Sequence, residues 1–305
     1  MKKINLFSIT LLCLLFQVSA QQSKNDLGQL GLKGMVQSME ERSYVAIDNF
    51  GKAEKGARVK DNTDHVFNKS GNHLEQEIYN NNGSLNVRYE YRYNASDKLT
   101  EQSLFNAGGS TRLKLKYKYD SKGKLAEQQS YKPDGSNLSK YTYEYDNKGN
   151  QLAYKWYNIE GVLDENTVNT YDANGNQLAS NSYNTDGSIN SKAVYQYDAA
   201  GNITEVQIAD SNNTIEKKSA FTYDNKQNVT SSILFNQDGT INKKNVLVYD
   251  IQNNVTEEEW LDKDGNVLER FTYKYEYDKR MNWTKKTVYR NGVPASITER
   301  AFTYF

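Results

Sequence analysis

An aromatic residue followed by Asp or Asn recurs every 26 residues, and this period constrains the fold more than any other feature of the chain. Seven consecutive steps of 26 residues are followed by one step of 28. The pairs are Phe67-Asn68, Tyr93-Asn94, Tyr119-Asp120, Tyr145-Asp146, Tyr171-Asp172, Tyr197-Asp198, Tyr223-Asp224, Tyr249-Asp250 and Tyr277-Asp278. Self-similarity at a fixed spacing is typical of repeat proteins, in which each unit contacts its sequence neighbours.

Each unit is predicted to contain two strands and two tight turns. In the copy that begins at Tyr145, residues 146–149 have the composition of a type I turn followed by a left-handed residue. A strand over 151–157 follows, then a second turn at 158–161 and a returning strand that ends at the next Tyr-Asp pair. Turns this short force consecutive strands to pair antiparallel.

The last residue of the first turn is predicted to need a positive φ. Most copies carry Gly there, because Gly adopts this conformation without a steric clash. Asp97 and Asn253 fill the position in two copies, and these residue types tolerate it next best. Gln227 and Met281 fit it poorly, so we expect local strain or a different turn at those two copies.

The predicted fold is all-β, with tandem 26-residue β-hairpin repeats forming one long antiparallel meander. Nine units predict roughly eighteen strands, and a twisted sheet that wide curls, here into a spiral or a barrel-like sheet. The repeat domain is predicted over residues 34–305, with an atypical N-terminal cap at 34–66 and about nine repeats at 67–305. Residues 21–33 are predicted to be a flexible leader.

Residues 1–20 have the pattern of a signal peptide, which predicts an exported protein, periplasmic or extracellular. Lys2 and Lys3 precede an apolar run over 6–18, and Ala20 closes a small-residue cleavage site. The alternative is a lipid-anchored precursor cut before Cys13, for which the preceding residue is unusually large. Cleavage after Ala20 removes the chain's one cysteine, so no disulfide is expected.

Composition predicts a thin, strand-rich protein whose apolar surface is mostly aromatic. Hydrophobic residues make up 37% of the chain and the mean hydropathy is −0.87, but 24 tyrosines argue against disorder. Charges of both signs are mixed along the sequence, so no nucleic-acid partner is expected. No later apolar run predicts a transmembrane helix. An outer-membrane barrel is a further alternative, and Lys155, Glu205 and Glu257 on short predicted strands argue against it.

The recurring Tyr-Asp-x-x-Gly, clearest at 119–123, 145–149, 171–175 and 197–201, resembles the YD (RHS-type) repeat of exported bacterial proteins. The resemblance implies β-hairpins in a spiralling sheet. Long members wrap into shells around a toxin domain, and some members are associated with carbohydrate binding or cell-surface contact. Here Asn150 and its equivalents stand where the family usually has Arg, the repeats are few, and nothing follows Phe305. The short secreted type without a toxin domain is the nearer likeness.

Two side-chain ladders follow from the period, and one of them suggests a ligand. Aromatic residues recur twelve positions after the Tyr-Asp pair, and cations recur at position twenty-one. Aromatic rings pack against the apolar faces of sugars, so we predict carbohydrate or cell-surface glycan binding by an exposed aromatic ladder. The predicted binding residues are Tyr131, Trp156, Tyr157, Tyr183 and Trp260. Two alternatives remain open: the rings simply fill the strand surface, or the protein is an envelope scaffold that docks a surface protein.

No enzyme constellation is predicted, and no catalytic residue, metal ligand or cofactor is assigned. The only histidines, His65 and His73, lie eight residues apart outside the repeat pattern. Asp262, Asp264 and Gly265 look like part of a calcium loop, but an EF-hand spreads its ligands over about twelve residues and ends in Glu. These Asp-Gly pairs sit on the repeat period, where a hairpin turn requires the same residue types.

Overall fold

The computed structural model describes residues 25–59 and 62–305. The predicted signal and the first four residues of the predicted leader lie outside the described residues. Within them the chain forms one short helix, α2 (Asp26–Gln29), and twenty-one strands, which confirms the all-β prediction. The strands are β1 (Val36–Asn49), β2 (Lys52–Arg58), β3 (Asn62–Phe67), β4 (His73–Tyr79), β5 (Leu85–Tyr93), β6 (Leu99–Asn106), β7 (Thr111–Tyr119), β8 (Leu125–Tyr131), β9 (Asn137–Tyr145), β10 (Gln151–Tyr157), β11 (Leu163–Tyr171), β12 (Gln177–Tyr183), β13 (Ile189–Tyr197), β14 (Ile203–Asp210), β15 (Ile215–Tyr223), β16 (Val229–Phe235), β17 (Ile241–Tyr249), β18 (Val255–Leu261), β19 (Val267–Tyr277), β20 (Trp283–Arg290) and β21 (Val293–Tyr304).

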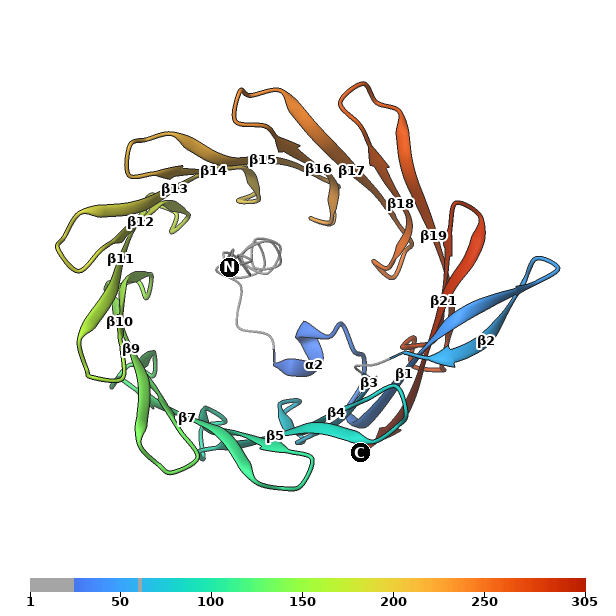
Figure 1. The fold of residues 1–305 in the computed structure, drawn as a ribbon, viewed down its shortest axis with the longest axis horizontal. Coiled ribbons are helices and arrows are strands. Elements are labelled where there is room, and N and C mark those ends of the chain that lie inside the picture. The colour runs from blue at the N-terminus through green and yellow to red at the C-terminus, as the bar shows by residue number, and fades with distance from the viewer. Residues whose placement is uncertain (1–24, 60–61) are drawn as a thin grey trace, which may run out of the picture.

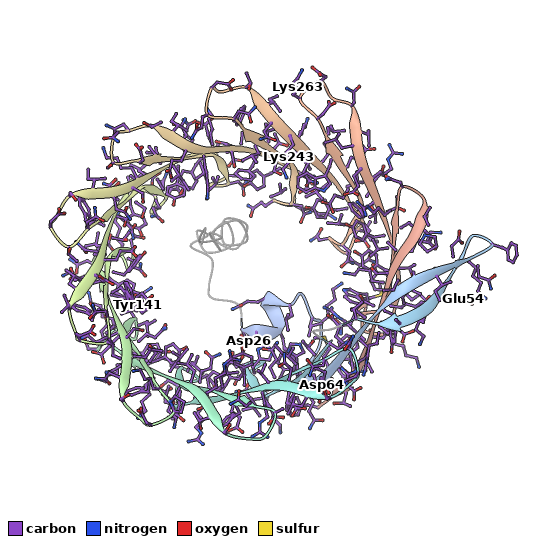
Figure 2. The ribbon with its side chains drawn as sticks, viewed as in Figure 1. Asp26, Glu54, Asp64, Tyr141, Lys243 and Lys263 are labelled. Carbon is purple, nitrogen blue, oxygen red and sulfur yellow. The ribbon has the colours of Figure 1, made fainter. Side chains whose placement is uncertain are left out.

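The sheet closes on itself. From β3 to β21 each strand pairs antiparallel with the next, as the short turns require. The 14-residue strand β1 then pairs with β3 on one side and with β21 on the other, in a register that runs from Val36↔Tyr304 to Val45↔Ser296. Twenty strands thereby form a closed ring (Figure 1), and the side chains on its inner face surround a lumen (Figure 2). β2 pairs with the far end of β1, and the two form a hairpin that projects from the ring (Figure 1).

The Asp of each Tyr-Asp pair organises the turn that follows it. One carboxylate oxygen of Asp146 accepts the backbone N–H of Asn150 at 2.8 Å, and the other accepts the amide side chain of Asn150 at 2.8 Å. The same two bonds join Asp172 to Asn176, Asp198 to Asn202 and Asp224 to Asn228. The Asn after each turn, where the YD-repeat family that this chain resembles usually has Arg, therefore stabilises the turn through these two hydrogen bonds.

The two unfavourable turn residues keep the turn and accept the strain. Gln227 and Met281 have φ of +67° and +64°. Their N–H groups still donate to the Asp224 and Asp278 carbonyls, at 3.0 and 3.1 Å, as in the glycine copies. The sequence predicted either local strain or a different turn at these two copies. The structure keeps the same turn, with a strained positive φ at Gln227 and Met281.

The position of α2 identifies the inward face of the sheet. α2 lies inside the ring (Figure 1), and its Leu27 packs against Met39 and Phe67. Phe67 is the first residue of the repeating aromatic series, and side chains alternate along a strand. The motif tyrosines of later repeats, such as Tyr145, therefore face the lumen, and the residues on either side of each face outward.

Part of the predicted flexible leader has a fixed place in the structure. The N–H of Leu27 donates to the Gly71 carbonyl at 3.0 Å, and the N–H of Lys33 donates to Asn282 Oδ1 at 2.7 Å. Leu27 is buried, and Leu30 and Leu32 pack against the same cluster. The leucines of this segment supply apolar surface that only burial satisfies, which is why residues 25–33 are ordered.

Six tyrosine hydroxyls tie one repeat to the preceding one. The hydroxyl of Tyr119 donates to the backbone carbonyl of Leu99, twenty residues earlier, at 2.8 Å. The same bond joins Tyr171 to Gln151, Tyr197 to Gln177, Tyr223 to Ile203, Tyr249 to Val229 and Tyr275 to Val255. This tyrosine staple fastens the wall where few side chains are fully buried, in keeping with the thin aromatic interior that composition predicts.

Candidate functional site

The five predicted binding residues do not form one surface, because they lie on both faces of the ring. Trp156 and Tyr157 are consecutive in β10, so they point in opposite directions. Trp156 lies opposite Tyr141 on the lumen face, and Trp260 occupies the equivalent position in β18. Tyr157 faces outward, as do its equivalents Tyr131 and Tyr183 in β8 and β12. Tyr131, Tyr157 and Tyr183, which belong to the predicted aromatic ladder, therefore lie on the outer face, and Trp156 and Trp260 lie on the inner face.

On the outer face, the aromatic and cationic ladders form one structure. Lys140 lies directly opposite Tyr157 in the register of β9 and β10, with its Nζ 4.7 Å from the ring centre. The same cross-strand contact places Arg88 over Phe105 and Lys218 over Phe235. Lys116 lies over Tyr131, and Tyr183 is opposite Asn166, the gap in the cationic series. Cation–π contacts of this kind cover ring faces that a sugar would need.

The outer face also carries ion pairs between neighbouring strands. They join Lys118 to Glu127, Lys155 to Glu144, Lys218 to Glu205 and Lys285 to Glu276, at 2.7 to 3.1 Å. A lipid-facing strand array needs an unbroken apolar band, so this charged face does not fit the outer-membrane alternative. Separately, the described part of the chain holds no helix long and apolar enough to cross a bilayer.

On the lumen face, Trp156 is the centre of an aromatic and carboxylate cell. Its ring stacks on Tyr141 with centroids 6.4 Å apart and planes inclined by 26°. Tyr154 lies beside the same Tyr141 ring at 6.4 Å. Across the next strand pair, Glu165 lies in register with Trp156. We call Trp156, Tyr141, Tyr154 and Glu165 the Trp156 cell.

Three hydroxyls hold the Glu165 carboxylate in place. Its Oε1 accepts from the Tyr154 hydroxyl at 2.9 Å, from Thr167 at 3.2 Å and from Ser182 at 3.4 Å. Burial raises the pKa of Tyr154 to about 12, so its phenol stays protonated and donates at neutral pH. The half-buried indole of Trp156 can pack against the apolar face of a sugar ring. The oriented carboxylate of Glu165 can accept hydrogen bonds from the sugar hydroxyls.

Trp260 has the equivalent position, and Glu269 lies in register with it as Glu165 does with Trp156, but Glu269 is paired with Arg290. On its other side, Trp260 lies opposite Asn245, whose amide donates to Glu258 at 2.9 Å. Lys243 lies over the indole, 4.6 Å from the ring centre. Figure 2 shows Tyr141 and Lys243 on different arcs of the ring. The ammonium group covers one face of Trp260, so the Trp156 cell is the better candidate for a ligand.

Sequence reasoning found Trp156 but missed the residues that complete its cell. Tyr141 lies 15 residues before Trp156 and Glu165 lies 9 residues after it, on the two adjacent strands. Counting back from the two turns places Lys155 opposite Tyr141 and Asp164 opposite Trp156, one residue away from the observed pairs, because each pairing contains a bulge. The turn spacing alone therefore does not identify the neighbours of Trp156.

The two histidines lie together, although the sequence assigned them no role. His65 Nδ1 and His73 Nε2 are 2.9 Å apart, and both rings belong to an aromatic stack that includes Phe67. Within residues 25–59 and 62–305, no group of three or more His, Cys, Asp or Glu side chains is arranged to hold a metal ion.

The Asp-Gly turns use their carboxylates internally. Asp262 Oδ1 accepts the backbone N–H groups of Asp264 and Asn266, each at 2.9 Å. Asp186 Oδ1 accepts both the N–H and the hydroxyl of Ser188. These bonds lower the pKa of Asp262 and Asp186. The carboxylates therefore serve the hairpins, which supports the turn interpretation over the calcium alternative.

Comparison with known proteins gives distant structural likenesses. No protein-family model and no curated protein matches the chain. A chain of the TcdB2-TccC3 complex is 14% identical with a TM-score of 0.34, over 86% of this chain and 17% of that one. A porin-like protein from Bacteroides uniformis is 13% identical with a TM-score of 0.34, over 88% of this chain and 96% of that one. The Photorhabdus luminescens Tc holotoxin pore is 11% identical with a TM-score of 0.30, over 83% and 17%. The chain spans about a sixth of these toxin chains.

Proposed function

We propose that the protein is an exported, non-enzymatic repeat protein that binds an uncharged carbohydrate, such as a polysaccharide or cell-surface glycan, inside its ring. The observation that carries the proposal is the Trp156 cell, in which an indole stacked on Tyr141 faces the lumen beside the oriented carboxylate of Glu165. This is a refinement of the ladder predicted from sequence, because the binding surface moves from the outer face to the inner one.

Two features of the molecule support a neutral sugar as the ligand. The ion pairs of the repeats lie mainly outside, where Lys155 meets Glu144 and Lys218 meets Glu205. The lumen wall near Trp156 carries tyrosines and hydroxyl or amide side chains, including Thr167. Hydroxyls and amides exchange hydrogen bonds with sugar hydroxyls at little desolvation cost, whereas a buried unpaired charge is expensive.

The family and the location belong to the same proposal. The motif Tyr-Asp-x-x-Gly in register along residues 67–305 supports assignment to the short, secreted type of YD-repeat protein. The signal pattern at 1–20 supports export to the periplasm or the cell exterior. Mass spectrometry of the N-terminus after expression with its signal tests both export and the cleavage site after Ala20.

A glycan array tests the proposal with two adjacent substitutions that lie on opposite faces. Trp156→Ala removes the indole from the lumen, and Tyr157→Ala removes the neighbouring ring from the outer face. We expect the wild-type protein and the Tyr157→Ala variant to bind the same glycans, and the Trp156→Ala variant to lose at least tenfold in affinity. Equal losses in both variants would contradict a lumen site, and silence of all three across neutral glycans would contradict carbohydrate binding.

A second candidate function is docking of an envelope protein, and the β1–β2 hairpin favours it. Phe50 at the hairpin tip is fully exposed, with a positive φ of +50°. A bulky residue at positive φ is strained, and strained backbone positions cluster at binding and catalytic sites. A photo-crosslinking residue at position 50, introduced in cells, should capture one defined partner if this candidate is correct. The same residue at position 159, an exposed turn on the opposite side of the repeat array, is the control.

A further inference from the structure

A chain of hydrogen bonds connects the N-terminal segment to the inner wall of the ring. Asp26 in α2 pairs with His73 Nδ1 at 3.2 Å and accepts the His73 backbone N–H at 2.6 Å. His73 Nε2 faces His65 Nδ1 at 2.9 Å, and His65 Nε2 faces the Thr63 hydroxyl at 2.9 Å. The chain therefore runs from a carboxylate through both histidines of the protein to a hydroxyl.

The order of donors and acceptors assigns the protons. The Asp26 carboxylate only accepts, so His73 carries its proton on Nδ1, and its Nε2 then accepts from His65. His65 in turn donates from Nδ1 and accepts the Thr63 hydroxyl proton at Nε2. Both rings are neutral in this arrangement. One added proton can be accommodated, because the hydrogen bond between the two rings can reverse its direction. A second added proton places two N–H groups face to face across 2.9 Å.

The charged surroundings oppose that second proton. His65 is buried, and it is faced by His73 on β4, by Asp26 on α2 and by Arg300 on β21. Arg300 is paired with Glu41 on β1 at 2.7 Å, Lys286 on β20 also faces this pair, and Asp64 lies on the other face of β3. Burial first, and then the charges of His73 and Arg300, lower the pKa of His65 to about 4.

The segment held by this chain covers an aromatic row of the lumen. Phe67 and His73 have ring centroids 4.6 Å apart, and His73 and Tyr91 have centroids 5.6 Å apart. Leu27 packs on Phe67, and Asp26 contacts His73, so α2 lies over this end of the row. The other bonds of the segment include the neutral backbone bonds of Leu27 and Lys33 described above.

We propose that residues 25–33 form a strap that covers the aromatic row Phe67–His73–Tyr91, and that protonation of His65, which faces the strap's anchor His73, releases it. The closed strap covers part of the lumen wall. When it is released, the aromatic row becomes exposed to the lumen. This inference does not depend on what the Trp156 cell binds.

The pH window follows from the lowered pKa of His65. A group whose pKa is depressed in the closed state stabilises that state above its ordinary value, and the effect is lost as pH falls. The ordinary value is 6.5 and the closed value is about 4. The stabilisation of the closed state by neutral His65 is therefore fully present above pH 7, weakens from about pH 6.5, and is lost below about pH 4. If the open state restores the ordinary value, opening increases about 30-fold between pH 7.5 and pH 5.

Hydrogen exchange read by mass spectrometry tests the release directly. The peptide that covers residues 25–34 contains the protected Leu27 and Leu32 amides, and the strand at 151–157 serves as an internal control. After correction for intrinsic rates, we expect strap protection to fall at least tenfold from pH 7.5 to pH 5 while the control strand stays unchanged. Constant strap protection, or a parallel loss in the control strand, would overturn the proposal.

Three variants and one NMR spectrum distinguish release of the strap through His65 from general acid sensitivity of the fold. His65→Asn should make strap protection independent of pH, and Asp26→Asn should lower it already at pH 7.5. Asp264→Asn, in an exposed turn far from the strap, is the matched control and should change neither. Nitrogen-detected NMR of the wild-type histidines should show the Nδ1–H tautomer for both rings at pH 7.5. An Nε2–H tautomer at either ring, or an acid response that survives His65→Asn, would refute release of the strap through His65.

Discussion

Removal of tyrosine-staple hydroxyls tests whether these bonds hold the ring wall together. Tyr119→Phe, Tyr171→Phe and Tyr223→Phe each delete one hydroxyl that donates to a carbonyl of the preceding repeat, at 2.7 to 2.8 Å. Each ring stays in place, so the loss is that of one hydrogen bond, about 1 kcal/mol. Unfolding entropy near 2.1 cal/mol/K per residue converts this into about 2 °C in Tm for a chain of this length.

The three sites are two repeats apart, roughly 19 Å along the sheet, so their effects should add. We expect the triple variant to lose about 3 kcal/mol and roughly 5 °C in Tm, followed by far-UV circular dichroism. Tyr183→Phe, on the outer face, is the control and should melt within about 1 °C of the wild-type protein. A triple variant that melts with the wild type, or a control that loses as much as a staple variant, would refute the reasoning.

Two further predictions concern the turns and the titration of the lumen. Gly149→Val and Gly175→Val should each destabilise by about 1 kcal/mol or more, because Val resists φ near +90°; Gly108→Val, which needs no positive φ and has open space, is the control for the melts. Burial raises the pKa of Tyr143 and of Tyr197 to about 12. The unfolded chain ionises near pH 10, so stability is full below pH 10 and declines as pH rises toward 12. Absorbance at about 295 nm should therefore show these phenols ionising together with unfolding, and ionisation near pH 10 in a chain that keeps its circular dichroism would contradict their burial.

The repeat period predicted the local structure closely because the turns leave the chain little choice. The strand predicted at 151–157 is β10 (Gln151–Tyr157), and Asp97 and Asn253 take the positive φ expected of them. Closure could not be predicted in the same way. It depends on accumulated twist and on the pairing of β1 with β21, two strands about 250 residues apart that carry no repeat motif.

The candidate site shows a different kind of gap. Alternation along a strand already separates Trp156 from Tyr157, so the sequence alone could have assigned these two residues to opposite faces of the sheet. Predicting the Trp156 cell requires the register of three strands. The bulges beside Tyr145 and Tyr157 shift that register by one residue, so spacing alone does not give it. The strap could not be anticipated, because a four-residue helix has no period and its anchor His73 lies outside the repeat pattern.

Cross-linking across the β1–β21 seam tests the central claim that the sheet is a closed ring with a separate inner face. Ser43 and Thr298 are paired in register, with hydroxyl oxygens 2.9 Å apart. Paired antiparallel residues lie at Cα distances that a disulfide can bridge. In a Cys13→Ser background, Ser43→Cys with Thr298→Cys should form an intramolecular disulfide under mild oxidation, seen by intact mass and a faster non-reducing band, whereas Ser43→Cys with Ser191→Cys should not. Failure of the seam pair to cross-link in the folded protein would mean that the sheet is an open spiral.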